Sequence, residues 1–92
     1  MYSTLKNRYP NYQPAIVVPD KDIFITKLKF LLPVDVNLGL VMAQIRKHIK
    51  TNQSEAIIFM IDNRIISPTT LVKEIMKNDF VYIRLMKESV FG

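Results

Sequence analysis

The order of the apolar patterns constrains this chain most, because short β-branched runs lie on both sides of one amphipathic helix. Residues 15–18 and 25–32 are predicted strands, and the second alternates lysines with apolar side chains. Asn37 can cap a helix that runs to about residue 50, with apolar side chains recurring on one face at the 3.6-residue period. The first half of the chain therefore predicts two strands followed by one main helix.

The second half adds two more strands and a short helix. Residues 56–61 are apolar on both faces, which predicts a central strand covered on each side. Asp62-Asn63-Arg64 is a predicted tight turn, Ser67 can cap a short helix near residues 68–76, and residues 80–86 form the last strand. One sheet with one main helix packed on it satisfies this order. We therefore expect an α+β, β-grasp architecture with a four-stranded mixed sheet.

The length of 92 residues suits one domain, with no repeat or linker to divide it. We expect residues 1–13 to be a short N-terminal segment with at most a helical stub, residues 14–86 to form the domain, and residues 87–92 to be a flexible tail. The N-terminus is polar and basic, which is unlike a signal peptide. No apolar run approaches the roughly 20 residues that span a bilayer.

The residue types needed for most catalytic and metal-binding chemistry are missing or isolated. The chain has no cysteine, which excludes disulfides, thiolate ligands and cysteine catalysis. Its two glycines, Gly39 and Gly92, cannot form a phosphate-binding loop, and the single histidine, His48, has no acid at a spacing typical of a triad. The sequence therefore predicts no enzyme activity, no metal site and no cofactor.

The formal charge of +5 favours anionic partners, among them nucleic acid, acidic peptides and anionic lipids. Basic residues could form one patch, and tyrosines could stack on bases. The residues concerned are Lys27, Lys29, Arg46, Lys47 and Lys50. A small basic nucleic-acid-binding domain is therefore an alternative, although no RRM, KH or helix-turn-helix motif is present. A solvated basic face explains the same residues, and we expect no specific nucleic-acid binding.

Several motifs along residues 5–92 have counterparts in one family. KFLLP at 29–33 and IRKHI at 45–49 resemble KYLVP and IRKRI, and EAIIFMIDN at 55–63 resembles EDALFFFVNN. FVYIRLMKESVFG at 80–92 is similar to FLYIAYSDESVYG without a gap. These are sequences of the ubiquitin-like autophagy modifiers, the relatives of the GABA-receptor-associated protein GABARAP. The family begins with two helices before its first strand, so the resemblance implies a truncated N-terminal helical extension here.

The resemblance implies a peptide-binding edge along the second strand, at which an extended peptide with an aromatic and an aliphatic residue three positions apart adds a strand. It places an aromatic pocket at Pro14, Ile16, Lys29, Leu31 and Phe80, and an aliphatic pocket at Phe30, Leu32, Pro33, Val36, Val41 and His48. Plain core packing explains Ile16, Leu31 and Val41 nearly as well. The lysines suit acidic residues that flank the peptide motif in receptor and adaptor proteins.

The resemblance also implies that Gly92, next to Phe91, is conjugated to phosphatidylethanolamine by activating and conjugating enzymes. Such a modifier is cytoplasmic and becomes bound to autophagosomal or related membranes once lipidated. A sister modifier that is conjugated to a protein lysine also ends in glycine and is the alternative within the same pathway. The ending ESVFG and the Leu-Leu-Pro stretch resemble the lipid-linked branch more closely.

Overall fold

The computed structural model describes residues 10–50 and 56–88. The predicted helical stub before Pro10 and the Phe91-Gly92 ending therefore lie outside the described residues. The elements, in chain order, are β1 (Tyr12–Pro19), β2 (Lys29–Pro33), α2 (Leu38–Arg46), β3 (Ile57–Ile61), β4 (Arg64–Ile65), the 3₁₀ helix η1 (Val72–Ile75) and β5 (Val81–Lys87).

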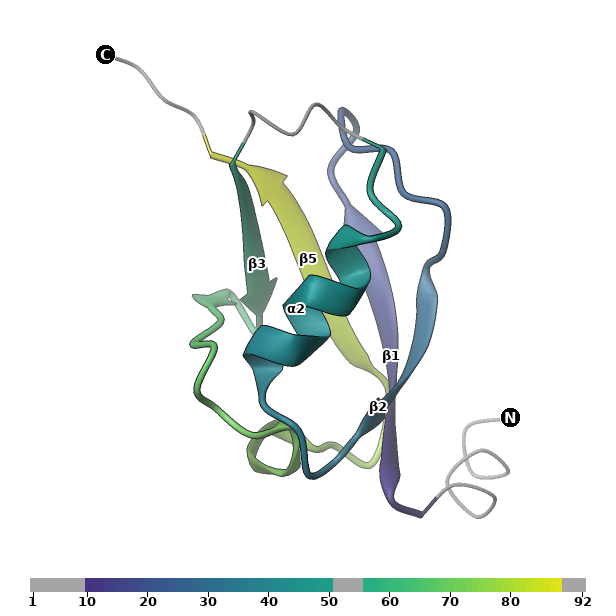
Figure 1. Cartoon of the computed structure of the whole chain (residues 1–92), viewed down its shortest axis with the longest axis vertical. Coiled ribbons are helices and arrows are strands. Elements are labelled where there is room, and N and C mark those ends of the chain that lie inside the picture. Colours follow the sequence, from purple (N-terminus) through teal and green to yellow (C-terminus); the bar gives the residue numbers. More distant parts are fainter. Residues whose placement is uncertain (1–9, 51–55, 89–92) are drawn as a thin grey trace.

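The strands form one mixed sheet in the order β2-β1-β5-β3-β4. β1 and β5 run parallel at its centre, while β2 pairs with β1, and β3 with β5, in antiparallel fashion. Figure 1 shows α2 lying across one face of this sheet. One sheet with one main helix is the predicted arrangement, and the α+β class is confirmed.

The core lies between α2 and the central strands. Leu38, Val41 and Ile45 form the buried stripe of α2, as the 3.6-residue period predicts. They pack with alternate residues of the sheet, which are almost inaccessible to solvent: Ala15, Val17, Phe59, Val81, Ile83 and Leu85. The Asn37 side chain caps the helix by accepting a hydrogen bond from the amide of Leu40 at 2.9 Å.

The described part of the chain forms a sheet of five strands, so the expectation of four was wrong. Asp62 and Asn63 both have positive φ, 54° and 64°, which is the geometry of a two-residue type I′ turn. This turn sends the chain back along β3, so that Arg64 pairs with Ile61 and Ile65 pairs with Met60. Arg64 is therefore the first residue of β4 and not the last of the turn.

The expectation that residues 56–61 form a strand covered on both faces was also wrong. β3 lies next to the two-residue β4 and near the sheet's edge. Phe59 and Ile61 are buried beneath α2, whereas Ile57, Ile58 and Met60 are only half-buried. An apolar run on both faces therefore reflects one core face and one partly exposed face.

The boundaries of several strands and of the main helix differ from the predictions. β1 begins at Tyr12, and β2 is confined to Lys29–Pro33 because Ile25 makes an isolated bridge to Ile49 instead. The same bridge ends the main helix early: α2 stops at Arg46, and residues 48–50 turn to pair with residues 24–26. Leu28, an apolar residue of the predicted strand 25–32, lies before β2 and is exposed.

The second helix is shorter than predicted and Ser67 does not cap it. The Ser67 hydroxyl is 3.1 Å from that of Thr69, in a turn before η1. The 3₁₀ helix begins after Leu71, whose amide donates to the Glu74 carboxylate at 2.8 Å. The preceding turn is held by α2 instead, since the amides of Leu38 and Gly39 donate to carbonyls of residues 70 and 68.

Candidate functional site

In the sheet formed by residues 10–50 and 56–88, β2 is an edge strand, because β1 is its only neighbour there. The register pairs Gln13 with Leu32 and Ala15 with Phe30. Hydrogen bonds at both ends of the ladder between β1 and β2 show which of the residue pairs are hydrogen-bonded. The amide of Val17 donates to the carbonyl of Leu28 at 2.7 Å, and the amide of Val34 donates to Asn11 at 3.1 Å. Antiparallel ladders alternate hydrogen-bonded and non-hydrogen-bonded pairs, so Phe30 and Leu32 use their backbone groups toward β1.

Lys29 and Leu31 consequently direct their backbone N–H and C=O groups outward, away from β1. They occupy the non-hydrogen-bonded pairs Ile16↔Lys29 and Pro14↔Leu31. Pro14 and Pro33 both lie in pairs of this kind, where a missing amide proton removes no hydrogen bond between β1 and β2. The outer edge of β2 therefore offers two donors and at least two acceptors to a further strand.

The five residues of the expected aromatic pocket surround one hollow, which we call the outer cavity. Its volume is about 660 Å³, and its lining consists of Pro14, Ala15, Ile16, Lys27, Lys29, Phe30, Leu31 and Phe80. Leu31 is 38 % exposed, which is high for a leucine in a strand and leaves its side chain available for contact. β1, β2 and the residue before β5 together supply the walls.

The six residues of the expected aliphatic pocket line a second hollow, the helix-side groove, of about 330 Å³. Its lining consists of Lys27, Phe30, Leu31, Leu32, Pro33, Val36, Leu40, Val41, Gln44 and His48. Leu32 and Val41 are 4 % and 3 % exposed, so they form its floor as part of the core. Leu40 and Gln44, on the exposed side of α2, are wall residues that the sequence analysis missed.

Phe30 separates the two hollows and is held in place by its neighbours. The His48 ring meets the Phe30 ring edge-on, with centroids 5.6 Å apart and an interplanar angle of 66°. The Lys27 ammonium lies 4.9 Å from the Phe30 centroid, within cation–π range. His48 also approaches the Thr26 hydroxyl through Nδ1 at 3.4 Å. Within the residues described, His48 is thus a wall residue of the groove with packing partners.

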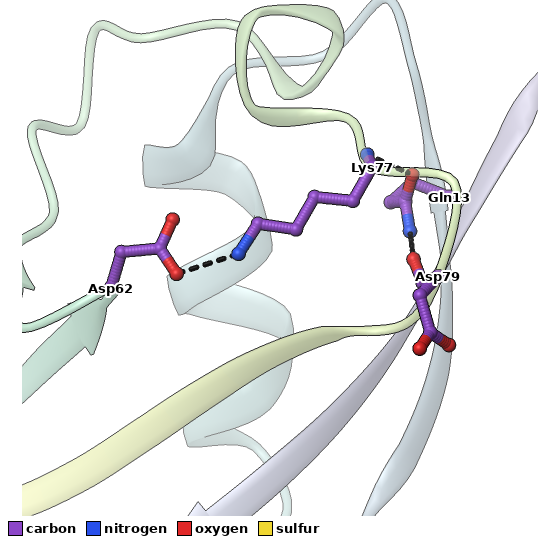
Figure 2. Close-up of polar contacts among 4 residues, drawn as sticks. All are labelled: Gln13, Asp62, Lys77 and Asp79. Atoms are coloured by element: carbon purple, nitrogen blue, oxygen red, sulfur yellow. Dashed lines mark hydrogen bonds and ion pairs between the residues drawn. The ribbon is translucent and has the colours of Figure 1, made fainter.

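Gln13, which the sequence analysis did not single out, fixes the segment that carries Phe80. Its fully buried side chain donates from Nε2 to the carbonyls of Pro14 and Asp79, both at 2.9 Å, and accepts from the Lys77 amide at 3.1 Å. Figure 2 shows the contacts of Gln13 with Lys77 and Asp79 beside the exposed ion pair between Lys77 and Asp62. The only sign of this role in the sequence was a glutamine beside a proline in an otherwise apolar strand.

Within the described residues, the structure contains neither a cluster of metal ligands nor a membrane-spanning helix. Residues 10–50 and 56–88 contain no group of three His, Cys, Asp or Glu side chains that could hold a metal ion. In the same ranges, no helix is long and apolar enough to cross a bilayer.

Solved structures with the same arrangement define the fold. Trypanosoma brucei ATG8 superposes with a TM-score of 0.77 at 21 % identity, covering 99 % of this chain and 85 % of that one. Plasmodium falciparum Atg8, solved with a Plasmodium falciparum Atg3 peptide, gives 0.80 at 17 % identity, covering 96 % and 85 %. At these identities the likeness shows the fold alone, which is the ubiquitin-like β-grasp.

Sequence comparison then gives the family. Residues 2–92 match the family model described as "Autophagy protein Atg8 ubiquitin like". The chain is 36 % identical over 97 residues to autophagy-related protein 8 of Schizosaccharomyces pombe, a match that covers 96 % of this chain and 79 % of that protein. It is 32 % identical over 97 residues to autophagy-related protein 8 of Dictyostelium discoideum, which covers 96 % of this chain and 80 % of that protein. The chain belongs to the Atg8 family of autophagy ubiquitin-like modifiers.

Proposed function

We propose that this modifier recruits partner proteins by adding an extended peptide strand to the outer edge of β2. The supporting observation is the pair of outward-facing residues, Lys29 and Leu31, with a hollow on each side of the strand. Backbone pairing supplies affinity that is independent of the partner's sequence, while the two hollows select its side chains.

The spacing of the motif follows from strand geometry. Successive side chains of a strand point to opposite faces, so residues i and i+3 lie on opposite faces, about 10 Å apart along the strand. A peptide paired with β2 therefore directs one of these residues to the outer cavity and the other to the helix-side groove. The outer cavity is twice as large, about 660 Å³ against 330 Å³, and so takes the aromatic residue.

Lysines favour acidic peptides at this edge. Lys27 lines both hollows, and Lys29 lines the outer cavity. Both side chains are exposed, so each contact with a flanking acid contributes only about 0–1 kcal/mol and weakens with salt. Charge therefore steers the peptide, whereas the apolar anchors provide most of the affinity.

Calorimetric titration with an acidic peptide carrying an aromatic-x-x-aliphatic motif tests this function. Leu31→Ala should weaken binding about tenfold, the loss expected when most of a buried leucine contact is removed. Lys29→Glu should weaken it up to about tenfold at low salt and less at high salt. Ile65→Ala, an exposed apolar residue on the opposite edge strand, is the matched control. Equal affinity for Leu31→Ala and wild type would contradict the proposal.

The second part of the proposal is covalent attachment of Gly92, through its carboxylate, to the amine of phosphatidylethanolamine. It rests on membership of the Atg8 family and on the ending Phe91-Gly92. Glycine has no Cβ, so its carboxylate can enter a narrow enzyme channel, and Phe91 supplies an apolar contact for the same enzymes. The Atg3 peptide bound to the Plasmodium protein supports a conjugating-enzyme partner here.

Attachment to the lipid would hold the domain at autophagosomal or related membranes, from a cytoplasmic pool. Each buried methylene contributes about 0.8 kcal/mol, so the two acyl chains of one phospholipid exceed the attraction of the surface charges. Anionic lipids add a smaller, salt-dependent term.

Incubation with the cognate activating and conjugating enzymes and phosphatidylethanolamine liposomes tests conjugation. The wild type should gain the mass of the lipid and float with the liposomes. Gly92→Ala and a form lacking Gly92 should stay folded, bind peptide and remain unmodified. Lipidation of the truncated form would place the attachment elsewhere, and transfer to a protein lysine in preference to the lipid would favour the sister-modifier alternative.

A further inference from the structure

Phe24 is an aromatic side chain that the proposed peptide-binding edge does not use. It is 70 % exposed, matched among the described large hydrophobic residues only by Ile65. It follows β1 in the connection to β2 and lines neither the outer cavity nor the helix-side groove. Exposing most of a phenylalanine ring to water is unfavourable, so a surface that covers it would be favoured.

The backbone that carries Phe24 is fixed, so the exposure is built into the fold. Ile23, the preceding residue, is buried in the core, and its amide donates to the carbonyl of Asp20 at 3.0 Å. The carbonyl of Phe24 accepts from the amide of Lys50 at 2.7 Å, and the amide of Thr26 donates to the carbonyl of His48 at 2.8 Å. Anchors on both sides therefore hold the aromatic ring outward.

Exposed lysines surround this position. Lys21 precedes Phe24 in the same loop, while Lys47 and Lys50 belong to the segment that is hydrogen-bonded to it. Two acids are also present: Asp20 lies 3.8 Å from the guanidinium of Arg84, and Asp22 is exposed. The surface is basic overall and includes the aromatic ring of Phe24, and the 46 %-exposed Leu28 follows in the same connection between β1 and β2.

This surface lies at the end of the sheet from which the tail departs. The amide of Asp20 donates to the carbonyl of Leu85 at 2.9 Å, two residues before the end of β5. Figure 1 shows the loop after β1 and the turn after α2 at the same end as the last residues of β5. Gly92 is four residues beyond Glu88, a span of at most about 14 Å.

We propose that Phe24, with Leu28 and the lysines around it, is a second membrane contact that inserts into the interface of an anionic bilayer. Aromatic rings favour the boundary between headgroups and acyl chains, and lysines beside them attract anionic headgroups. The proposal rests on the proposed function in one respect, since attachment at Gly92 brings this end of the domain to the membrane. The contact then sets the orientation of the domain.

The chain contains neither cysteine nor tryptophan, which allows a specific test. The full-length Gly92→Cys, Phe24→Trp variant is coupled to a maleimide lipid in vesicles of phosphatidylcholine and phosphatidylserine, with brominated phosphatidylcholine as quencher. The single tryptophan should shift to shorter emission wavelength and be quenched. The matched control is Gly92→Cys, Ile65→Trp, because Ile65 is equally exposed but lies on the far edge strand. Its emission should stay unchanged.

Chemical coupling bypasses the conjugating enzymes, so failure of enzymatic lipidation would leave this test intact. Emission at position 24 typical of water, or equal quenching at position 65, would overturn the proposal. A concentration-dependent shift without vesicles would also overturn it, in favour of contact between copies of the chain.

With the unanchored protein, Lys50→Gln should weaken cosedimentation with the phosphatidylserine vesicles about fivefold, the factor for one lysine at an anionic surface.

Discussion

Replacing Gln13 by leucine tests how the structure positions the wall of the outer cavity. Leucine has a similar size but cannot hydrogen-bond, so the substitution removes all three hydrogen bonds of the Gln13 side chain, with the Pro14 carbonyl, the Asp79 carbonyl and the Lys77 amide. Lys77 and Asp79 belong to the segment that leads to Phe80, a wall residue of the cavity. We expect the segment to lose its fixed position and the protein to lose stability.

The size of the effect follows from the three hydrogen bonds that the substitution removes. An intramolecular hydrogen bond contributes about 0.5–1.5 kcal/mol to stability, and this substitution removes three of them. The expected loss is therefore about 2–4 kcal/mol, a large share of the stability of a domain this size. At about 4 °C per kcal/mol or more, the Tm should fall by at least about 8 °C.

Urea and thermal unfolding followed by circular dichroism measure this loss, and Lys77→Met provides the matched control. The Lys77 ammonium lies 2.6 Å from Asp62, but both side chains are largely exposed, at 39 % and 63 %. Removing that ion pair should cost no more than about 1 kcal/mol. A Tm for Gln13→Leu within about 2 °C of wild type, or an equal loss for Lys77→Met, would refute the reasoning.

Three further changes test local parts of the fold by the same unfolding measurements. Asn37→Ala should cost about 1 kcal/mol by removing the cap on the Leu40 amide, and an unchanged Tm would contradict that role. Gly39→Ala should destabilise the protein even though alanine favours helices over glycine by about 1 kcal/mol. The added Cβ would lie 3.1 Å from the Pro68 side chain and 3.2 Å from the Pro68 carbonyl oxygen. A gain in stability would show that this contact relaxes. Asn63→Val should cost about 1–2 kcal/mol, since a β-branched residue is strained at a φ of 64°, and an equal loss for Asn63→Gly would implicate lost side-chain contacts instead.

Hydrophobic periodicity predicted the order of the strands and the main helix. That order depends on which side chains are buried, and the spacing of apolar residues in the sequence shows this directly. The buried stripe Leu38, Val41 and Ile45 is the one that the helical period selects. The end of α2 was mispredicted because residues 48–50 pair with a distant segment, and helical period alone contains no information about that bridge. β4 was missed for a related reason, since a two-residue strand is defined by its partner.

The candidate site was predicted through family resemblance and not through periodicity. The eleven expected pocket residues line two adjoining hollows, but Leu40, Gln44 and the supporting Gln13 were not identified. Leu40 and Gln44 resemble ordinary surface residues of a helix. Gln13 has a role only because the chain between η1 and β5 passes beside it, which is a tertiary contact across 64 to 66 residues.

Amide hydrogen exchange along β2 tests the peptide-binding edge most directly. In the free protein, the amides of Phe30 and Leu32 should be protected by pairing with β1, whereas those of Lys29 and Leu31 should exchange rapidly. Saturation with the acidic aromatic-x-x-aliphatic peptide should slow exchange at Lys29 and Leu31 and change the other two little. Unchanged exchange at Lys29 and Leu31 in the saturated complex would show that the peptide binds elsewhere.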